Sequence, residues 1–235
     1  MEISKHFANA KTLMIGAVVA IAMTLACSSL AFADTNVKVS GTFSDGKAIS
    51  ETVNIDGLYK SGLTPVYGMY YKSSAWNVLA TTSYVPVEDV LNEAIDQYNG
   101  KYEGEYELSN LYTASKKMTL TVADDGGTTY TKYYPTYADI FSTKSFFGDA
   151  LNSDLTLSSS LLTSTNPTGA VLAKSYGLAA ADSGATASTA ATAALAMESV
   201  TSEYPRLITG CATDMTNTTA MGKRYVYDVT GITLS

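Results

Sequence analysis

A leader at the amino terminus constrains this chain most, because it sets where the folded part begins and in which compartment it folds. Residues 1–33 join two lysines to an uncharged apolar stretch at 13–25 and to the small-residue motif Ala31-Phe32-Ala33. This order is typical of a secretory signal peptide that is cleaved before Asp34. We therefore predict export to the cell surface or the extracellular space, and a single domain over residues 34–235.

Two other interpretations of the leader stay open. Thr24-Leu25-Ala26-Cys27 resembles a bacterial lipobox, although Thr24 stands where leucine is usual, so Cys27 is a candidate for lipidation. Alternatively, the uncharged run Thr12–Ala33 is long enough to span a bilayer if it is not cleaved. An uncleaved leader or a lipidated Cys27 would be the protein's only attachment to a membrane.

Composition excludes several kinds of chemistry from the part that follows the leader. The single histidine is His6, and the two cysteines are Cys27 and Cys211. Residues 34–235 therefore cannot form a Ser-His-Asp triad, a Cys-His pair, a histidine-liganded zinc site or an internal disulfide. The formal net charge of −7 opposes a nucleic-acid partner, since binding phosphates needs a basic face. Hydrophobic residues make up 46% of the chain, enough for a core without disulfides.

Hydrophobic patterning predicts a fold of the α+β class. Apolar residues recur at helical spacing from Pro86 to Tyr98, and Asn99-Gly100 is expected to end this helix. Lys117–Ala123 and Thr128–Tyr134 alternate on either side of an Asp-Asp-Gly-Gly turn, which predicts a hairpin. Further strands are predicted at Val37–Phe43, Ile49–Ile55, Val66–Tyr71, Trp76–Ala80 and Arg224–Leu234, and a short helix or loop at Ala138–Phe147.

Residues 151–199 differ from the rest in composition. Alanine, serine and threonine supply more than half of them, and few are charged. Such a segment offers little amphipathic pattern, so we predict a Ser/Thr/Ala-rich excursion on the surface of the domain.

Two groups of residues are candidates for binding. Glu103, Glu105 and Glu107 alternate and would share one face of a strand, which favours either a solvated strand or, as the alternative, a calcium site. Tyrosine is unusually frequent, with 17 residues. Tyrosine suits wet surfaces that bind carbohydrate or protein, but it also covers half-buried sheet positions, so both interpretations stay open. The clustered tyrosines are Tyr67, Tyr70, Tyr71, Tyr130, Tyr133, Tyr134 and Tyr137.

Four segments resemble, in order, the sulfite-oxidase-type molybdopterin-binding domain. Val85–Ala94 is similar to its V-P-L-x-D-L-L-x-x-A helix, and Met118–Tyr130 to its strand–turn–strand. Tyr204–Gly210 is similar to its P-L-R-L-V strand, and Gly222–Leu234 to its closing strand. The resemblance covers about residues 65–235 and implies an α+β fold with a mixed sheet and flanking helices.

The chain departs from that family at the metal site. The family holds molybdenum through a cysteine in the first half of the domain, but this chain has no cysteine between Ser28 and Gly210. The resemblance therefore implies a degenerate domain without molybdopterin, of the kind found in exported bacterial surface proteins. It places a former cofactor pocket near Arg206, Lys223 and Arg224, with Cys211 nearby.

The expected function is a non-catalytic, surface-associated domain that binds a surface protein or a small ligand, without a cofactor or a metal. Arg206, Lys223, Arg224 and Cys211 are the candidate ligand-binding residues. The alternative is a molybdopterin-dependent oxidoreductase in which Cys211 serves as an atypical metal ligand. Arg206 also has a purely structural alternative, which is an ion pair with Glu203.

Overall fold

Strict alternation of buried and exposed residues builds the first sheet. The structure is a computed structural model, and it describes residues 35–72, 75–123, 129–130, 135–143, 166–181, 193–196, 200–209 and 226–235. Every second side chain is buried along β2 (Ala48–Asn54), and β1 (Asn36–Thr42) alternates in the same way as far as Val39. The two strands form an antiparallel hairpin whose turn includes Gly46 at a φ of 90°, a conformation that glycine adopts readily.

The first sheet is mixed and has the order β2-β1-β10-β6-β7. The last strand, β10 (Val229–Leu234), lies parallel to β1 in the middle of the sheet. β6 (Met118–Val122) pairs antiparallel with β10, and β7 (Thr129–Tyr130) pairs with β6. The pairing of β10 with β6 shifts register between Val229 and Gly231.

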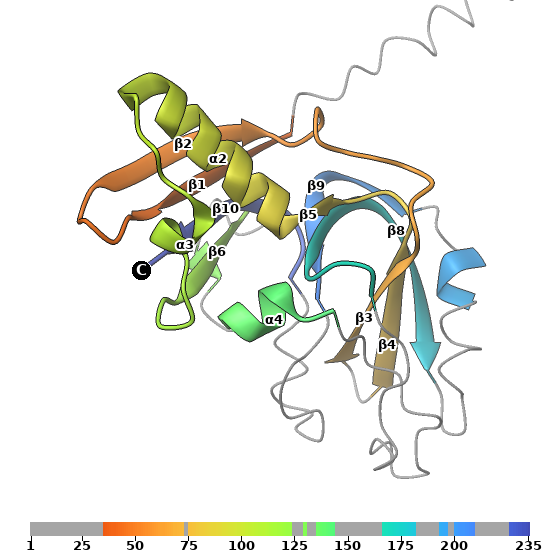
Figure 1. Ribbon diagram of the computed structural model, residues 1–235. Helices are drawn as coiled ribbons and strands as arrows, with labels where there is room; N and C mark the ends of the chain where they lie inside the picture. Colours follow the sequence, from red (N-terminus) through yellow and green to blue (C-terminus); the bar gives the residue numbers. More distant parts are fainter. Residues whose placement is uncertain are drawn as a thin grey trace, which may run out of the picture. The chain divides into compact units, whose positions relative to one another are not determined.

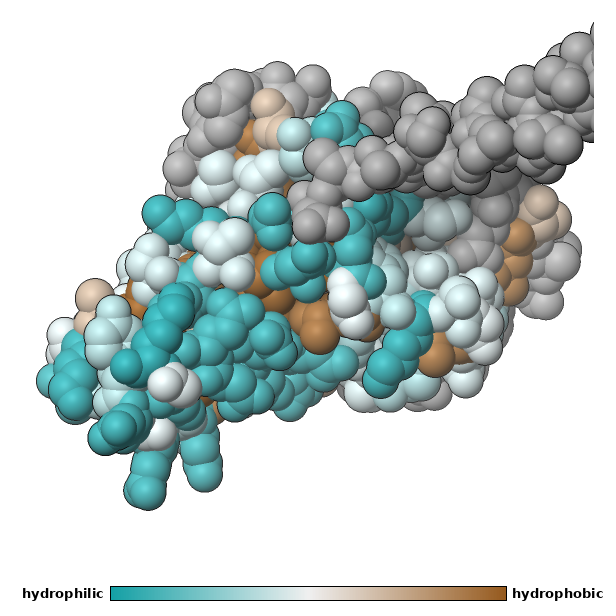
Figure 2. All heavy atoms as spheres, turned by 90° about the horizontal axis from the view of Figure 1, so that it is seen from above, coloured by the Kyte–Doolittle hydropathy of each residue, from teal (hydrophilic) through white to brown (hydrophobic). Residues whose placement is uncertain are grey.

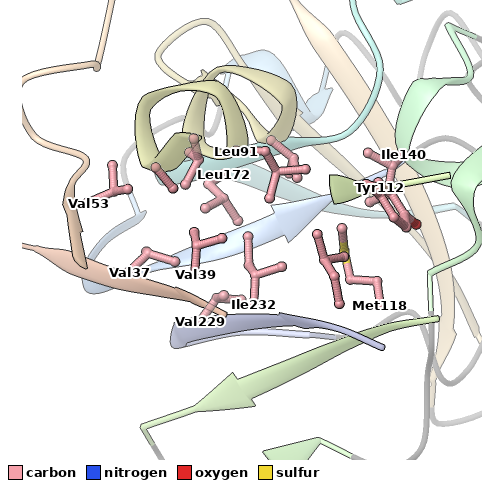
Figure 3. Close-up of a cluster of buried hydrophobic side chains, with 14 of the residues drawn as sticks. Val37, Val39, Val53, Leu91, Tyr112, Met118, Ile140, Leu172, Val229 and Ile232 are labelled. Carbon is pink, nitrogen blue, oxygen red and sulfur yellow. The ribbon is translucent and has the colours of Figure 1, made fainter. Parts of the chain in front are cut away.

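The helix α2 (Val87–Tyr102) covers the inner face of this sheet (Figure 1). Its buried residues repeat at helical spacing: Val87, Val90, Leu91, Ala94, Ile95 and Tyr98. Figure 3 shows Val39 and Ile232 of the sheet pointing toward Leu91 of α2 and Leu172. Figure 2 views the molecule from above, and hydrophilic side chains predominate over the described residues of this face.

A second, antiparallel sheet lies beside the first core. Its order is β3 (Val66–Lys72), β4 (Ala75–Thr81), β8 (Val171–Ala181) and β5 (Val85–Pro86), and β9 (Val200–Ile208) pairs with β8. It has its own small apolar cluster. The members of that cluster are Val66, Tyr70, Leu79, Tyr84, Val171, Ala173, Tyr176 and Ile208.

Short helical segments connect the sheets. They are α3 (Leu108–Leu111), α4 (Tyr137–Phe141) and a turn of helix at 193–196. A capping box closes the start of α4, where Thr136 Oγ1 accepts a hydrogen bond from the Asp139 N–H and Asp139 Oδ2 accepts one from the Thr136 N–H. Residues Asp34–Ser235 form one compact unit by their contacts. In the part of the chain that the structure describes, no helix is both long and apolar enough to cross a membrane.

The α+β class with a mixed sheet is confirmed, but three local predictions are wrong. The helix does not end at Asn99-Gly100, because it continues to Tyr102 and ends at Glu103 in the left-handed conformation. Residues 103–107 form no strand. Val171–Ala181, within the predicted excursion, is a largely buried strand between β4 and β9. The sequence did not predict this strand, because its alanines are small and give little hydrophobic contrast even where they pack closely in a sheet.

Two glycines test this geometry by opposite effects on stability. A Cβ at Gly169 would lie 1.9 Å from the Ile140 carbonyl oxygen, whereas a Cβ at Gly100 meets nothing within 4 Å. We expect Gly169→Ala to lower the free energy of unfolding by about 3 kcal/mol, because backbone must move. Gly100→Ala should raise it by about 0.5 kcal/mol, because alanine is the better helix former. Urea denaturation measures both, and a destabilising Gly100→Ala would contradict the extended helix.

Candidate functional site

Arg206, the first of the predicted ligand-binding residues, is enclosed by aromatic rings. It lies in β9 and is 2% exposed. Its guanidinium carbon is 5.0 Å from the ring centroid of Tyr70 and 5.0 Å from that of Tyr176. Ring faces stabilise a buried cation electrostatically. The guanidinium therefore lies against two tyrosines of the second sheet's apolar cluster.

The other predicted ligand-binding residues cannot be placed beside Arg206. Cys211, Lys223 and Arg224 lie outside the described residues. Glu203, the alternative partner of Arg206, is exposed, and its carbonyl oxygen accepts a hydrogen bond from the Thr35 hydroxyl. Ligand binding by Arg206, Lys223, Arg224 and Cys211 therefore stays a prediction.

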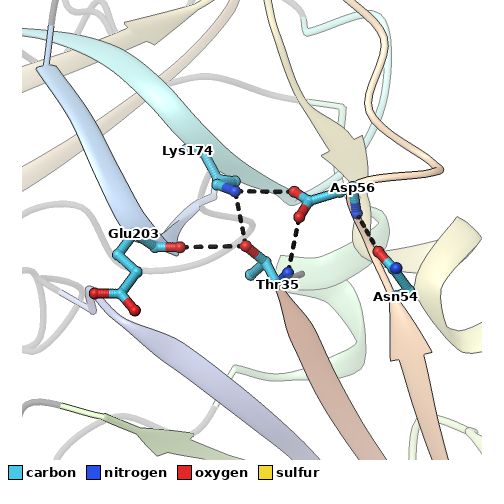
Figure 4. Close-up of polar contacts among 5 residues, drawn as sticks. All are labelled: Thr35, Asn54, Asp56, Lys174 and Glu203. Atoms are coloured by element: carbon cyan, nitrogen blue, oxygen red, sulfur yellow. Dashed lines mark hydrogen bonds and ion pairs between the residues drawn. The ribbon is translucent and has the colours of Figure 1, made fainter. Parts of the chain in front are cut away.

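A polar network links the two sheets near Thr35 (Figure 4). Lys174 Nζ of β8 donates to Thr35 Oγ1 at 2.7 Å and to Asp56 Oδ1 at 2.9 Å. The Thr35 N–H donates to Asp56 Oδ2 at 2.7 Å, and the Asp56 N–H donates to Asn54 Oδ1 at 3.0 Å. The sequence signal for this network was Asn54-Ile55-Asp56-Gly57, which is typical of a turn closed by an asparagine side chain.

The network changes the acidity of its members. Burial alone would raise the pKa of Asp56, but the hydrogen bonds from the Thr35 N–H and Lys174 outweigh it and leave the pKa below its ordinary 3.8. Burial, together with the charge of Asp56, raises the pKa of Tyr59. Asp56 thus stays ionised and holds the ammonium of Lys174, and we assign the network to stability.

A groove lined by tyrosines is the strongest candidate for binding. We call it the tyrosine groove. It has a volume of about 410 Å³ and is lined by Lys47, Tyr98, Tyr102, Glu103, Gly104, Glu105 and Tyr106. Its walls come from the end of α2, the segment that follows it and the β1–β2 turn. Tyr102 is 66% exposed and is the exposed large hydrophobic side chain of the described residues.

The rings of the groove are held at angles to one another. The Tyr98 and Tyr102 centroids are 4.7 Å apart with an interplanar angle of 42°, and those of Tyr98 and Tyr106 are 5.6 Å apart with an angle of 75°. Tyr106 stacks on Phe43 at 4.0 Å, and its hydroxyl donates to Asp45 Oδ2 at 2.6 Å. That hydrogen bond, with one from the Lys47 N–H, lowers the pKa of Asp45. The position of Tyr106 is therefore fixed on two sides.

The sequence singled out other tyrosines and missed these. Tyr70 is buried, Tyr67 is half-buried, and Tyr137 packs against Tyr112 and Phe141. The structure leaves undescribed Tyr133, Tyr134 and the side chains of Tyr71 and Tyr130. The available signal was the spacing of Tyr98 and Tyr102, because residues four apart are neighbours on a helix. Tyr106 follows the end of α2, so helical spacing does not place it.

The three glutamates are separated rather than gathered into a calcium site. Glu103 is the left-handed cap of α2, and Glu107 takes part in the capping box of α3. Glu105 lies between them, in the wall of the groove. Among the described residues, no three His, Cys, Asp or Glu side chains are grouped closely enough to hold a metal ion.

Comparison with protein-family models, with curated proteins and with solved structures finds no match to this chain. The resemblance to the sulfite-oxidase-type molybdopterin-binding domain therefore stays a prediction. Function is therefore inferred from the tyrosine groove and from the predicted amino-terminal leader.

The polar network predicts a specific dependence of stability on pH. Asp56→Asn should lower the free energy of unfolding at pH 7 by about 2 kcal/mol, because Lys174 loses its counter-charge. The pKa of Asp56 is lowered in the folded state, so its contribution is complete above about pH 4 and is lost as the pH falls through the folded value. The difference between wild type and variant should therefore shrink at pH 2. Urea denaturation at both pH values measures it.

The control for this experiment is Asp96→Asn, which changes an exposed carboxylate of α2. It should alter stability by less than about 0.5 kcal/mol at either pH. A loss in Asp56→Asn that is equal at pH 7 and pH 2 would show that the carboxylate charge does not matter.

Proposed function

We propose that this protein is an exported, surface-associated domain that does no catalysis and binds a surface protein or a small ligand in the tyrosine groove. The fold we propose is the shell of the sulfite-oxidase-type domain without its metal. The observation that carries the proposal is the groove itself, which Tyr98, Tyr102 and Tyr106 line beside charged side chains, because concave sites lined by aromatic rings and a few polar groups are typical of binding sites.

The size and chemistry of the groove support this function. A volume of about 410 Å³ is within the range of small-molecule sites, which is about 300–1,000 Å³. Tyrosine gives a large contact area at a low entropic cost, because its side chain has only two rotatable torsions. The neighbouring carboxylates of Glu103 and Glu105 are exposed and can accept hydrogen bonds. The leader at residues 1–33 supports export.

Processing of the leader tests the export step. When the full chain is expressed with its leader in a bacterial host, we expect the exported protein to begin at Asp34, because Ala31-Phe32-Ala33 is the cleavage motif. Amino-terminal sequencing with intact mass measures this. A product that begins at a lipid-modified Cys27 would support a lipoprotein instead, and uncleaved protein retained in the cytosol would contradict export.

Binding in the groove is tested with the same exported protein and a defined set of probes. The set holds a lysine- and arginine-containing peptide, maltotetraose and inorganic phosphate. We expect one of them to shift the amide resonances of Gly104 and Glu105, which line the groove. Tyr102→Ala should weaken that probe about fivefold, while Tyr102→Phe, which keeps the ring, should bind like wild type.

Two outcomes would contradict this function. If no probe shifts the groove resonances, the groove is not the binding site. If the protein, purified from a host that loads a control molybdoenzyme, carries molybdenum and pterin near one per chain and Cys211→Ser removes them, the protein is an oxidoreductase with Cys211 as a ligand.

A further inference from the structure

The tyrosine groove carries an excess of negative charge. Glu103 and Glu105 line it, both exposed, and Lys47 is the one basic residue among its lining residues. The charge of Lys47 is already matched by Asp45, whose Oδ2 lies 3.7 Å from Lys47 Nζ. The carboxylates of Glu103 and Glu105 thus remain to attract a positive group that comes from outside.

The arrangement of the rings favours a cation over a sugar. A sugar stacks best on flat ring faces that lie in one plane, but the groove's rings are inclined at 42° and 75° to one another. Tyr106 is stacked on Phe43. The Tyr102 ring is exposed, and the negative face of an aromatic ring attracts positive charge. An open tyrosine face beside carboxylates therefore suits an ammonium or guanidinium group.

Lys47 shows that the groove already holds such a group. Its Nζ lies 5.3 Å from the centroid of the Tyr106 ring, within the range of a cation–π contact. A lysine side chain is charged at neutral pH, and the Tyr106 hydroxyl beside it raises the pKa of Lys47 further. Yet the side chain is 63% exposed, and an exposed ion pair is weak. Lys47 can therefore move out of the groove at little cost.

We propose that the tyrosine groove binds a lysine or arginine side chain of a partner protein, and that Lys47 occupies part of the groove until the partner displaces it. This inference rests on the proposed function and names the chemistry of its ligand. Glu103 and Glu105 supply the charge that attracts the partner, and Tyr102 supplies the open ring face.

Calorimetry on the exported protein tests the proposal. The probes are a short peptide of alternating lysine and glycine and the neutral sugar maltotetraose, each at 50 mM and 300 mM NaCl. We expect the peptide to bind, and to bind more weakly at the higher salt concentration, because screening weakens attraction between charges. Maltotetraose should not bind.

Three variants test how the charges of the groove change the affinity for the peptide. The double variant Glu103→Gln/Glu105→Gln should lower the affinity for the peptide about fivefold, because two attractive charges are lost. Lys47→Met should raise the affinity for the peptide about threefold, because the competing ammonium is gone. The matched control Glu88→Gln/Asp96→Asn removes two exposed carboxylates of α2 outside the groove and should change affinity less than twofold. Thermal unfolding confirms that each variant is folded.

Each contrary result overturns a stated part of the proposal. Binding of maltotetraose without salt dependence would overturn the cationic ligand but leave the groove as a binding site. Equal weakening by the control variant would show that the peptide responds only to the acidity of the whole protein. Weaker binding of the peptide to Lys47→Met would overturn displacement. No binding of the peptide would overturn the inference, and the proposed function would fall with it only if maltotetraose and inorganic phosphate also left the groove resonances unshifted.

Discussion

The parallel pairing of β1 with β10 is the interaction on which the rest of the structure depends. It joins the first described strand to the last one, in the middle of the first sheet, with Val39 opposite Ile232. Both side chains point into the core beneath α2. Bringing such distant segments together lowers the entropy of the chain, and burial and the hydrogen bonds of neighbouring strands must offset this loss. Without β10, β1 and β6 would each lose a partner strand.

The close packing at this pairing explains why Gly41 is needed. A Cβ at Gly41 would lie 2.9 Å from the Leu234 carbonyl oxygen and 3.2 Å from a methyl of Leu111. The second sheet depends on the same core, because Leu172 of β8 and Leu207 of β9 belong to it. The network of Thr35, Asp56 and Lys174 adds a polar connection between the sheets. Apolar contacts and polar contacts thus connect the two sheets at different places.

Sequence patterns predicted helices and strands reliably where one face of the element is exposed to solvent. β1, β2, β6 and the start of α2 were predicted because apolar and polar residues alternate with the period of the element. The pattern failed in β8, whose alanines and glycine carry little hydrophobic contrast although most of the strand is buried. It also failed at Gly100, because glycine ends a helix only where the backbone turns left-handed, and here Glu103 makes that turn.

The groove could not be predicted, because it joins a turn at residue 47 to the end of a helix more than fifty residues later. Their proximity follows from the sheet. Lys101, in the last turn of α2, is hydrogen-bonded to Glu51 of β2, which is 5% exposed, and this contact fixes the end of the helix against the hairpin. Phe43, at the start of the turn, is buried and stacks on Tyr106. These contacts hold the backbone of the groove in place, whereas the side chains of Lys47 and Tyr102 are exposed to solvent. A site of this kind can exchange one cation for another without a change of fold, since only exposed side chains have to move.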